Sequence, residues 1–166
     1  KQENYLFRGQ NCDWPLIPKI GRVKTRKALL ETEAEMLDEF KRLSKPFMSS
    51  APTNELEWLS LAQHHGMATR LLDWTTNPLA AAWFAVQKPC PEEFGIVWMF
   101  DPPINDIIKA GKATSVDPFE GKRSKIFQPN ITTARIQSQN GWFTLHKYHD
   151  TTSRFTAFEK NRFYNK

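Results

Sequence analysis

The sequence lacks the features that mark several common classes of protein. Within its 166 residues no run of 18 apolar residues occurs, so no stretch is long enough for a transmembrane helix. There is no internal repeat and no low-complexity segment. The motifs GxxxxGK(S/T), GxGxxG, GxSxG and HExxH are also absent, which leaves the common nucleotide-binding and hydrolase mechanisms unsupported. We therefore expect no membrane partner and no standard phosphate-binding loop.

Cysteine is scarce. Cys12 and Cys90 are far apart and form no C-x-x-C pair. Isolated cysteines of this kind predict neither a disulfide framework nor a zinc site, and they favour a reducing, cytoplasmic environment. The first residue is not methionine and no signal peptide is present. We expect residues 1–166 to form a single domain that is an excerpt of a longer chain.

Composition and charge fit a globular protein with an anionic partner. Hydrophobic residues make up 40% of the chain and aromatic residues 13%, enough for a packed core. The net charge is +5, which permits a phosphate-bearing partner, either a nucleotide or a nucleic acid. Lysine and arginine are dense at 19–27 and 122–125 but otherwise spread out, so scattered surface cations explain the charge equally well.

Hydrophobic periodicity predicts an α+β fold. A helix is expected over 28–44, and a second helix begins at Asn54, with Glu57 at the capping-box position, and ends near Gly66. Strands are expected over 4–10, 69–75, 95–100, 126–127 and 142–145, with a helical turn over 134–139. Helices gather in the N-terminal half and strands in the C-terminal half. This order favours helices packed on a mixed, mostly antiparallel sheet over a doubly wound parallel one.

The stretch 59–86 combines core-forming and polar residues. Asn77 can cap and Pro78 can open a helix over 79–86 that is apolar almost all round, so we expect that helix, including Trp83, to be buried. Polar side chains are unusually frequent just before it: Gln63, His64, His65, Arg70, Asp73 and Thr75. Burying so many polar groups is costly. Two interpretations stay open, a hydrogen-bond network that braces the core and a functional site.

Arg8 and the histidines are the individual residues with the clearest chemistry. Arg8 ends the first predicted strand beside Gly9, so it is either an anion clamp with a ligand close to the backbone or an ordinary exposed arginine. We expect its guanidinium to share a cleft with His65 or Arg70. His64 and His65 end a helix, where a histidine can act as a general acid or base, donate to a substrate or cap the helix.

The second pair of histidines gives weaker evidence of function. His146 and His149 are spaced H-x-x-H on a strand-to-loop segment, would not share a face there, and have no evident third ligand. We therefore expect no metal site.

Several motifs together resemble the FRG domain family. They are FRG at 7–9, WPLIP at 14–18, LAQHHGMATRLLDWTTNPLAAAWFA at 61–85 and ARIQSQNGWF at 134–143. The resemblance covers most of the chain, from about Tyr5 to Phe143. It implies a bacterial or phage domain whose pattern continues with one more strand and a helix beyond these residues.

A looser resemblance is to the ADP-ribosyltransferase fold of the arginine-serine-glutamate kind. It implies that Arg8 holds the phosphates of a nicotinamide dinucleotide and that Asp73 and Thr75 lead from the second strand into the following helix. Gln139 stands where the fold carries a glutamate that binds the ribose and stabilises positive charge. A neutral glutamine offers little charge stabilisation, so Asp73 or Glu159 would have to supply the acid, or the site binds without turnover.

The resemblances imply a set of roles. The catalytic residues would be Arg8, His65, Asp73 and Gln139, and NAD would be bound by Arg8, Gly9, Gln63, His64, Arg70 and Thr75. The leading function is a dinucleotide-binding, ADP-ribosyltransferase-like domain of a bacterial or phage toxin or defence effector. The alternatives are a nucleic-acid-binding module that uses exposed aromatic residues such as Trp14 or Trp142, and a non-catalytic interaction domain.

Overall fold

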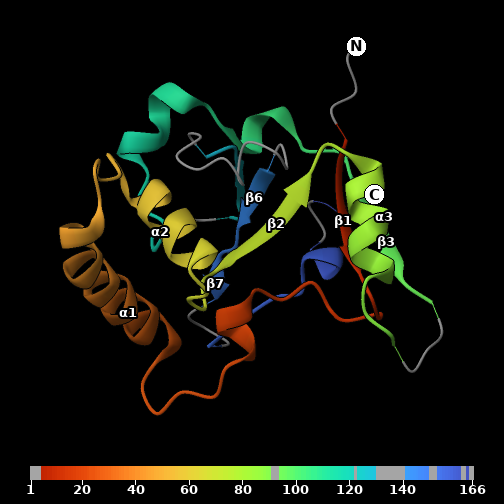
Figure 1. Ribbon diagram of the computed structural model, residues 1–166, viewed down its shortest axis with the longest axis horizontal. Helices are drawn as coiled ribbons and strands as arrows, with labels where there is room; N and C mark the ends of the chain where they lie inside the picture. Colours follow the sequence, from red (N-terminus) through yellow and green to blue (C-terminus); the bar gives the residue numbers. More distant parts are fainter. Residues whose placement is uncertain are drawn as a thin grey trace.

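The computed structural model describes residues 5–90, 94–121, 123–129, 141–149, 153–161 and 164. Its centre is a six-stranded sheet in the order β3-β1-β2-β6-β5-β4 (Figure 1). The strands are β1 (Leu6–Gln10), β2 (Leu71–Thr75), β3 (Ile96–Phe100), β4 (Ile107–Ile108), β5 (Lys125–Phe127) and β6 (Gly141–Leu145). Neighbouring strands are antiparallel except for the parallel pair β4 and β5. The expected α+β fold with a mixed, mostly antiparallel sheet is confirmed. The expected helical turn over 134–139 lies outside the described residues.

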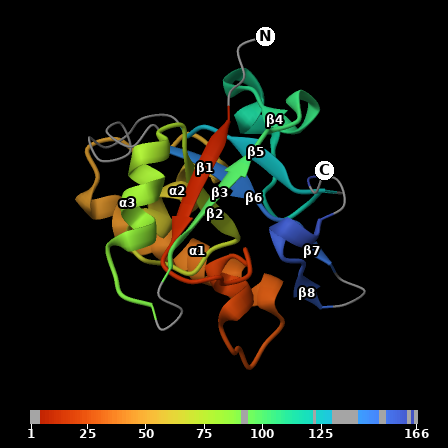
Figure 2. The ribbon, with the colours of Figure 1, turned by 90° about the vertical axis from the view of Figure 1, so that its right-hand side faces the viewer.

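Smaller elements complete the chain. Strands β7 (Tyr148–His149) and β8 (Arg154–Phe155) form a separate two-stranded sheet, which lies apart from the main sheet in Figure 2. Short 3-10 helices occur at Lys19–Arg22, Lys45–Phe47, Ile104–Asp106, Ala110–Ser115 and Phe158–Lys160. Within the described part of the chain, no helix combines the length and apolar character needed to cross a membrane.

The described residues include three α-helices, and two of them begin at a capping asparagine. They are α1 (Leu29–Ser44), α2 (Glu55–His64) and α3 (Pro78–Val86). The Asn54 side chain accepts a hydrogen bond from the Glu57 backbone N–H at 3.0 Å, while the Glu57 carboxylate accepts one from the Thr53 N–H at 2.7 Å. At α3, Asn77 accepts from the Leu79 N–H at 3.0 Å and Pro opens the helix. These caps satisfy N–H groups that the first turn leaves unpaired.

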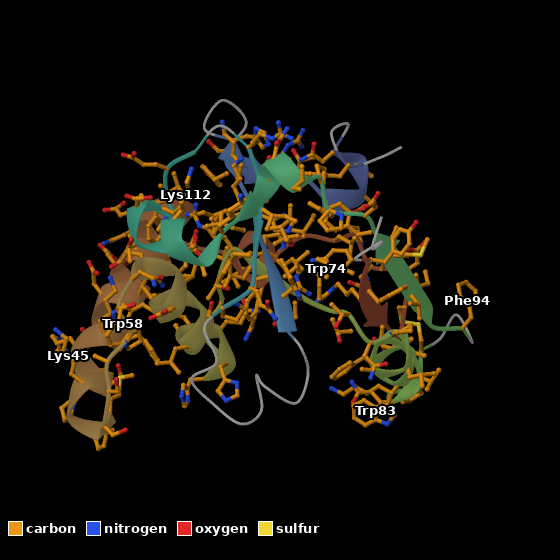
Figure 3. All side chains as sticks on the ribbon, turned by 90° about the horizontal axis from the view of Figure 1, so that it is seen from above. Lys45, Trp58, Trp74, Trp83, Phe94 and Lys112 are labelled. Atoms are coloured by element: carbon orange, nitrogen blue, oxygen red, sulfur yellow. A yellow bond between two sulfur atoms is a disulfide. The ribbon has the colours of Figure 1, made fainter. Side chains whose placement is uncertain are left out.

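The core has two layers, one on each face of the sheet. On one face, α1 and α2 bury Leu37 and Leu59 against Leu71 of β2 and Leu145 of β6. On the other face, a second cluster is built around Trp74 of β2. Its further members are Leu6, Leu16, Leu72, Phe100, Ile126 and Phe158. Figure 3 shows Trp74 in the interior and Trp58 on the helical side.

Helix α3 is not buried, which corrects the expectation from its composition. It contacts β1, β2 and β3, and its buried residues are Ala81 and Ala85. Leu79, Trp83 and Val86 point away from the sheet, and Trp83 is 58% exposed. Figure 3 shows Trp83 and Phe94 at the outer edge of the molecule. Close approach to the sheet selects the small alanines for the inner face, so most of the large side chains lie outside it.

Cys12 and Cys90 form a disulfide, so the expectation of two unpaired cysteines is wrong. Their Cα atoms lie 5.7 Å apart, within the usual range for a disulfide, although 78 residues separate them in the sequence. The two segments meet because β1 and α3 pack against each other. Cys12 lies in the segment after β1, and Cys90 lies in the segment after α3. The cysteine content therefore no longer argues for a reducing, cytoplasmic environment.

Candidate functional site

A cavity of about 380 Å³ lies over the middle of the sheet, between α2 and α3. Strands β1, β2 and β6 contribute its floor, while α2 and α3 contribute its walls. Its lining includes charged, polar, aromatic and small side chains. They are Phe7, Arg8, Gly9, Ser60, Gln63, His64, Asp73, Trp74, Thr75, Ala80, Ala81, Phe84, Gly141, Trp142 and Phe143. The volume falls within the usual range for a small-molecule site.

Arg8 reaches the cavity because β1 and β2 separate. The two strands pair only at Phe7 opposite Thr75, whereas β1 pairs with β3 along its whole length. Beyond that position the Asp73 carbonyl accepts a hydrogen bond from Arg8 Nη1 at 2.8 Å. Gln10 Oε1 accepts a second from Arg8 Nε at 3.3 Å. The Arg8 side chain is therefore held in the gap between two strands, and only 19% of it is exposed.

The charge on Arg8 is only partly compensated. Its Nη1 lies 3.7 Å from an Asp73 carboxylate oxygen, and that carboxylate also accepts from Gln63 Nε2 at 2.8 Å. Burial lowers the pKa of the Arg8 guanidinium, Asp73 raises it again, and the charge of Arg22 lowers it further. Among the described residues no hydrogen bond is formed by Arg8 Nη2. A desolvated cation with an unused donor can bind an anion with little rearrangement.

Gly9 allows α3 to pack directly on β1. A Cβ at this position would collide with the Ala81 carbonyl oxygen and would lie 2.8 Å from the Ala85 backbone nitrogen. Glycine is the residue that permits such an approach of two backbones. The sequence interpretation assigned the close approach at Gly9 to a ligand, whereas here it is made by a helix. Gly9 also lines the cavity, beside Phe84 of α3.

The structure brings most of the expected polar residues together. Arg8, Gln63, His64, Asp73 and Thr75 all line the cavity. The Thr75 hydroxyl also accepts from the Asn77 backbone N–H at 3.1 Å, which fixes the turn from β2 into α3. Apart from Arg8 of β1, these residues share the cavity because α2 and β2 are joined by a short connection and packed side by side (Figure 1).

Other expected site residues do not line the cavity. His65 is exposed, and its ring lies 6.0 Å from that of Phe40. Glu159 accepts a hydrogen bond from the Leu16 backbone N–H at 3.1 Å, so its carboxylate anchors a loop. Among the described residues, Asp73 is the one carboxylate that lines the cavity. Gln139 lies outside the described residues.

Arg70 is committed to a buried ion pair, which corrects its expected role in ligand binding. Its Nε and Nη2 donate to Glu33 Oε2 at 2.9 and 2.8 Å, and its Nη1 donates to the Pro118 carbonyl at 2.8 Å. Both side chains of the pair are at most 2% exposed. The expectation that Arg8 shares a cleft with His65 or Arg70 is therefore wrong.

The aromatic side chains of the cavity were the least evident part from sequence. Phe7, Phe84 and Trp142 line it, from β1, α3 and β6 respectively. Phe84 is separated from the exposed Trp83 by a single helical step, and the helix is apolar all round. The hydrophobic periodicity of the helix therefore did not indicate whether Phe84 or Trp83 points into the cavity. The polar residue Ser60 of α2 was hidden in the same way within a buried helix.

A buried polar chain runs beneath the cavity floor. Trp74 Nε1 donates to Thr144 Oγ1 at 3.0 Å, and that hydroxyl lies 2.9 Å from His146 Nε2. Burial lowers the pKa of His146 to about 3, and the charges of Arg8 and Arg70 add to this effect. His146 is therefore neutral at physiological pH and braces β2 against β6.

Comparisons with known proteins give one match. A family model described as the FRG domain matches residues 3–93, which is more than half of the chain. The matched region contains β1, both helices that wall the cavity, and β2, but not β6. Searches of the curated proteins and of the solved structures found no match.

Proposed function

The chain belongs to the FRG domain family, and we propose that its cavity binds a nicotinamide dinucleotide as an ADP-ribosyltransferase-like site. The observation that carries the proposal is Arg8, a mostly buried guanidinium held between two separated strands at the edge of a cavity of about 380 Å³. A planar guanidinium matches two phosphate oxygens at once, so it suits the pyrophosphate of a dinucleotide.

The remaining lining residues suit the nicotinamide riboside half of such a ligand. Phe84 and Trp142 offer aromatic surface to a flat heterocycle. The Gln63 amide donates to Asp73 and accepts from the Thr69 hydroxyl, which leaves one N–H of the amide for a ligand, and the His64 imidazole also lines the cavity. Both groups can hydrogen-bond a carboxamide or ribose hydroxyls. A mixture of apolar surface and a few convergent polar groups is typical of small-molecule sites.

We assign to the Asp73 carboxylate the role of stabilising the positive charge that forms during the reaction. In the reaction, the bond between ribose C1′ and the nicotinamide nitrogen breaks, and its electron pair neutralises the pyridinium as nicotinamide leaves. A nucleophile then forms a bond to C1′ and loses a proton; with water the products are ADP-ribose, nicotinamide and H⁺. The ribose carries positive charge in between, and a carboxylate beside the cavity stabilises that charge.

Calorimetric titration with NAD tests binding. Arg8→Lys keeps the charge but loses the planar fork, so NAD affinity should fall about ten- to a hundredfold, as expected for lost charge-assisted hydrogen bonds of about 1.5–3 kcal/mol. Arg26→Lys is the matched control, because Arg26 is exposed and does not line the cavity. The proposal fails if the wild-type protein does not bind NAD, or if both substitutions weaken binding equally.

Nicotinamide release, followed by chromatography, tests turnover separately. Asp73→Asn should suppress the release while NAD binding stays within a few-fold of wild type, because the amide keeps the shape and loses the charge. Unchanged release would remove Asp73 from the reaction. Gln139→Glu introduces the acid that the transferase resemblance lacks, and we expect it to raise the release.

The biological role we propose is that of a toxin or defence effector, which would modify a molecule needed for growth. Inducible expression of the wild-type domain in a bacterium should then slow growth, whereas Arg8→Lys and Asp73→Asn should relieve the effect. Growth arrest by all three proteins alike would contradict a role for the cavity.

A further inference from the structure

A second cavity, of about 310 Å³, adjoins the first. The two share Arg8, Gly9 and Phe84. The rest of the second cavity comes from two segments, one that follows β1 and one that follows α3. The first segment provides Gln10, Asn11, Trp14, Pro15, Ile17 and Arg22, and the second provides Gln87 and Lys88. Arg8 thus lies at the boundary between two adjoining spaces.

Positive charge is concentrated in this second cavity. Arg8, Arg22 and Lys88 line it, and none of its lining residues within the described part of the chain is a carboxylate. Arg22 is close enough to Arg8 for its charge to lower the pKa of the Arg8 guanidinium. Placing like charges together is unfavourable unless an anion offsets the repulsion. The lining therefore suits a phosphate group.

An aromatic side chain stands beside these cations. Trp14 lines the cavity and is 58% exposed. Its backbone is fixed, since the Trp14 carbonyl accepts a hydrogen bond from Gln10 Nε2 at 2.7 Å. An exposed indole next to cations is the usual means of stacking a nucleobase while its phosphate is neutralised.

The two segments of the second cavity are joined covalently. The Cys12–Cys90 disulfide links the segment after β1 to the segment after α3. Asn11 Nδ2 also donates to the Pro89 carbonyl at 3.3 Å, so a hydrogen bond crosses at nearly the same place. Both links hold the walls of the cavity in position before a ligand arrives, which reduces the entropy lost on binding.

We propose that this second cavity is a nucleotide subsite that holds the adenylate half of the dinucleotide, with its base on Trp14 and its phosphate between Arg22 and Lys88. The inference rests on the proposed function of the first cavity, and it assigns one half of the ligand to each space. At about 380 and 310 Å³, each cavity is close to the lower limit for a small-molecule site. A whole dinucleotide would occupy both, with its pyrophosphate next to Arg8.

Titrations with half-ligands test the assignment. The probes are adenosine monophosphate, nicotinamide mononucleotide and NAD, and the variants are Arg22→Gln, Lys88→Gln and Trp14→Ala, with Arg26→Gln as a matched control. Arg22→Gln and Trp14→Ala should each weaken adenosine monophosphate about tenfold and leave nicotinamide mononucleotide within twofold. The proposal would be overturned if Arg22→Gln and Trp14→Ala both left the affinity for adenosine monophosphate unchanged. It would also be overturned if adenosine monophosphate and nicotinamide mononucleotide competed for the same site.

Failure of the two proposals can be told apart. If the nicotinamide half does not bind but adenosine monophosphate binds and depends on Arg22, the second cavity stands as a nucleotide site and the transferase function fails. If NAD binds and no second-cavity variant weakens it, the function stands and the subsite fails. Displacement of adenosine monophosphate by single-stranded oligonucleotides, with a steep dependence on salt, would overturn the subsite in favour of a nucleic-acid surface.

The disulfide provides an additional readout. Reduction of Cys12–Cys90 should weaken adenosine monophosphate severalfold and nicotinamide mononucleotide less, because the bond joins the walls of the second cavity. Equal losses for both half-ligands would mean that reduction loosens the whole domain, and would contradict a specific role of the disulfide in this cavity.

Discussion

The buried ion pair of Arg70 and Glu33 allows a quantitative test of what stabilises the fold. In Arg70→Met, the Glu33 carboxylate loses two hydrogen bonds from the guanidinium and keeps the one from the Arg70 backbone N–H at 2.7 Å. The contact between the guanidinium and the Phe119 ring, 4.5 Å to the centroid, is lost as well. A buried carboxylate without its partner costs about 3–5 kcal/mol. That is a large part of the roughly 5–15 kcal/mol that stabilises a typical domain.

Urea denaturation followed by tryptophan fluorescence measures this cost, since the chain has six tryptophans. The double variant Glu33→Leu/Arg70→Met removes both charges, so it should be more stable than Arg70→Met alone. The proposed NAD binding should be retained by the folded fraction, because Arg70 does not line the first cavity. The reasoning is refuted if Arg70→Met unfolds within about 1 kcal/mol of wild type, or if the double variant is the less stable one.

Three further predictions concern the same fold. Trp83→Ala should change the free energy of unfolding by less than about 1 kcal/mol, because the side chain is 58% exposed; a loss of about 3–5 kcal/mol would show that the helix is buried in solution. Gly9→Ala should cost about 1–3 kcal/mol, since its methyl group would collide with the Ala81 carbonyl; an unchanged melting temperature would contradict the close approach of α3. Burial lowers the pKa of His146 to about 3, so stability is full above about pH 6.5 and falls towards pH 3 by about 1.4 kcal/mol per unit, as the unfolded chain alone takes up the proton. His146→Gln should flatten this slope in pH-dependent denaturation, and an equal slope would exclude His146 as its source.

Local signals were sufficient for most secondary structure. The Asn54 cap and the Asn77–Pro78 start are short-range features, and both helices begin there. The apolar run over 95–100 became β3 (Ile96–Phe100), and the strands expected over 69–75 and 142–145 pair with each other as β2 (Leu71–Thr75) and β6 (Gly141–Leu145). The grouping of helices before strands was enough to predict the fold class because antiparallel sheets need no helix between successive strands.

The expectations that were wrong concern contacts between distant parts of the chain. Arg8 lies in the middle of β1 and Arg70 directly precedes β2, and only Arg70 meets Glu33, on a helix 37 residues earlier. The Cys12–Cys90 pair likewise depends on how β1 and α3 come together. For α3, a helix apolar on all sides has no preferred face, so its sequence did not reveal that the alanines would be inside. The site was therefore predictable as a group of polar residues, and not as a cavity with particular walls.

The order of strands in the sheet has a consequence for how the domain is made. Arg8 contacts Asp73 across 65 residues, and Trp74 contacts Thr144 across 70. Such non-local pairing is associated with slow folding. Closing a long loop costs conformational entropy before the stabilising contacts between its ends can form. A ribosome delivers the chain from its N-terminus, so β1, α2, β2 and α3 emerge well before β6. The first cavity therefore has no complete floor until β6 has emerged, and any activity that depends on it begins only after β6 has paired with β2.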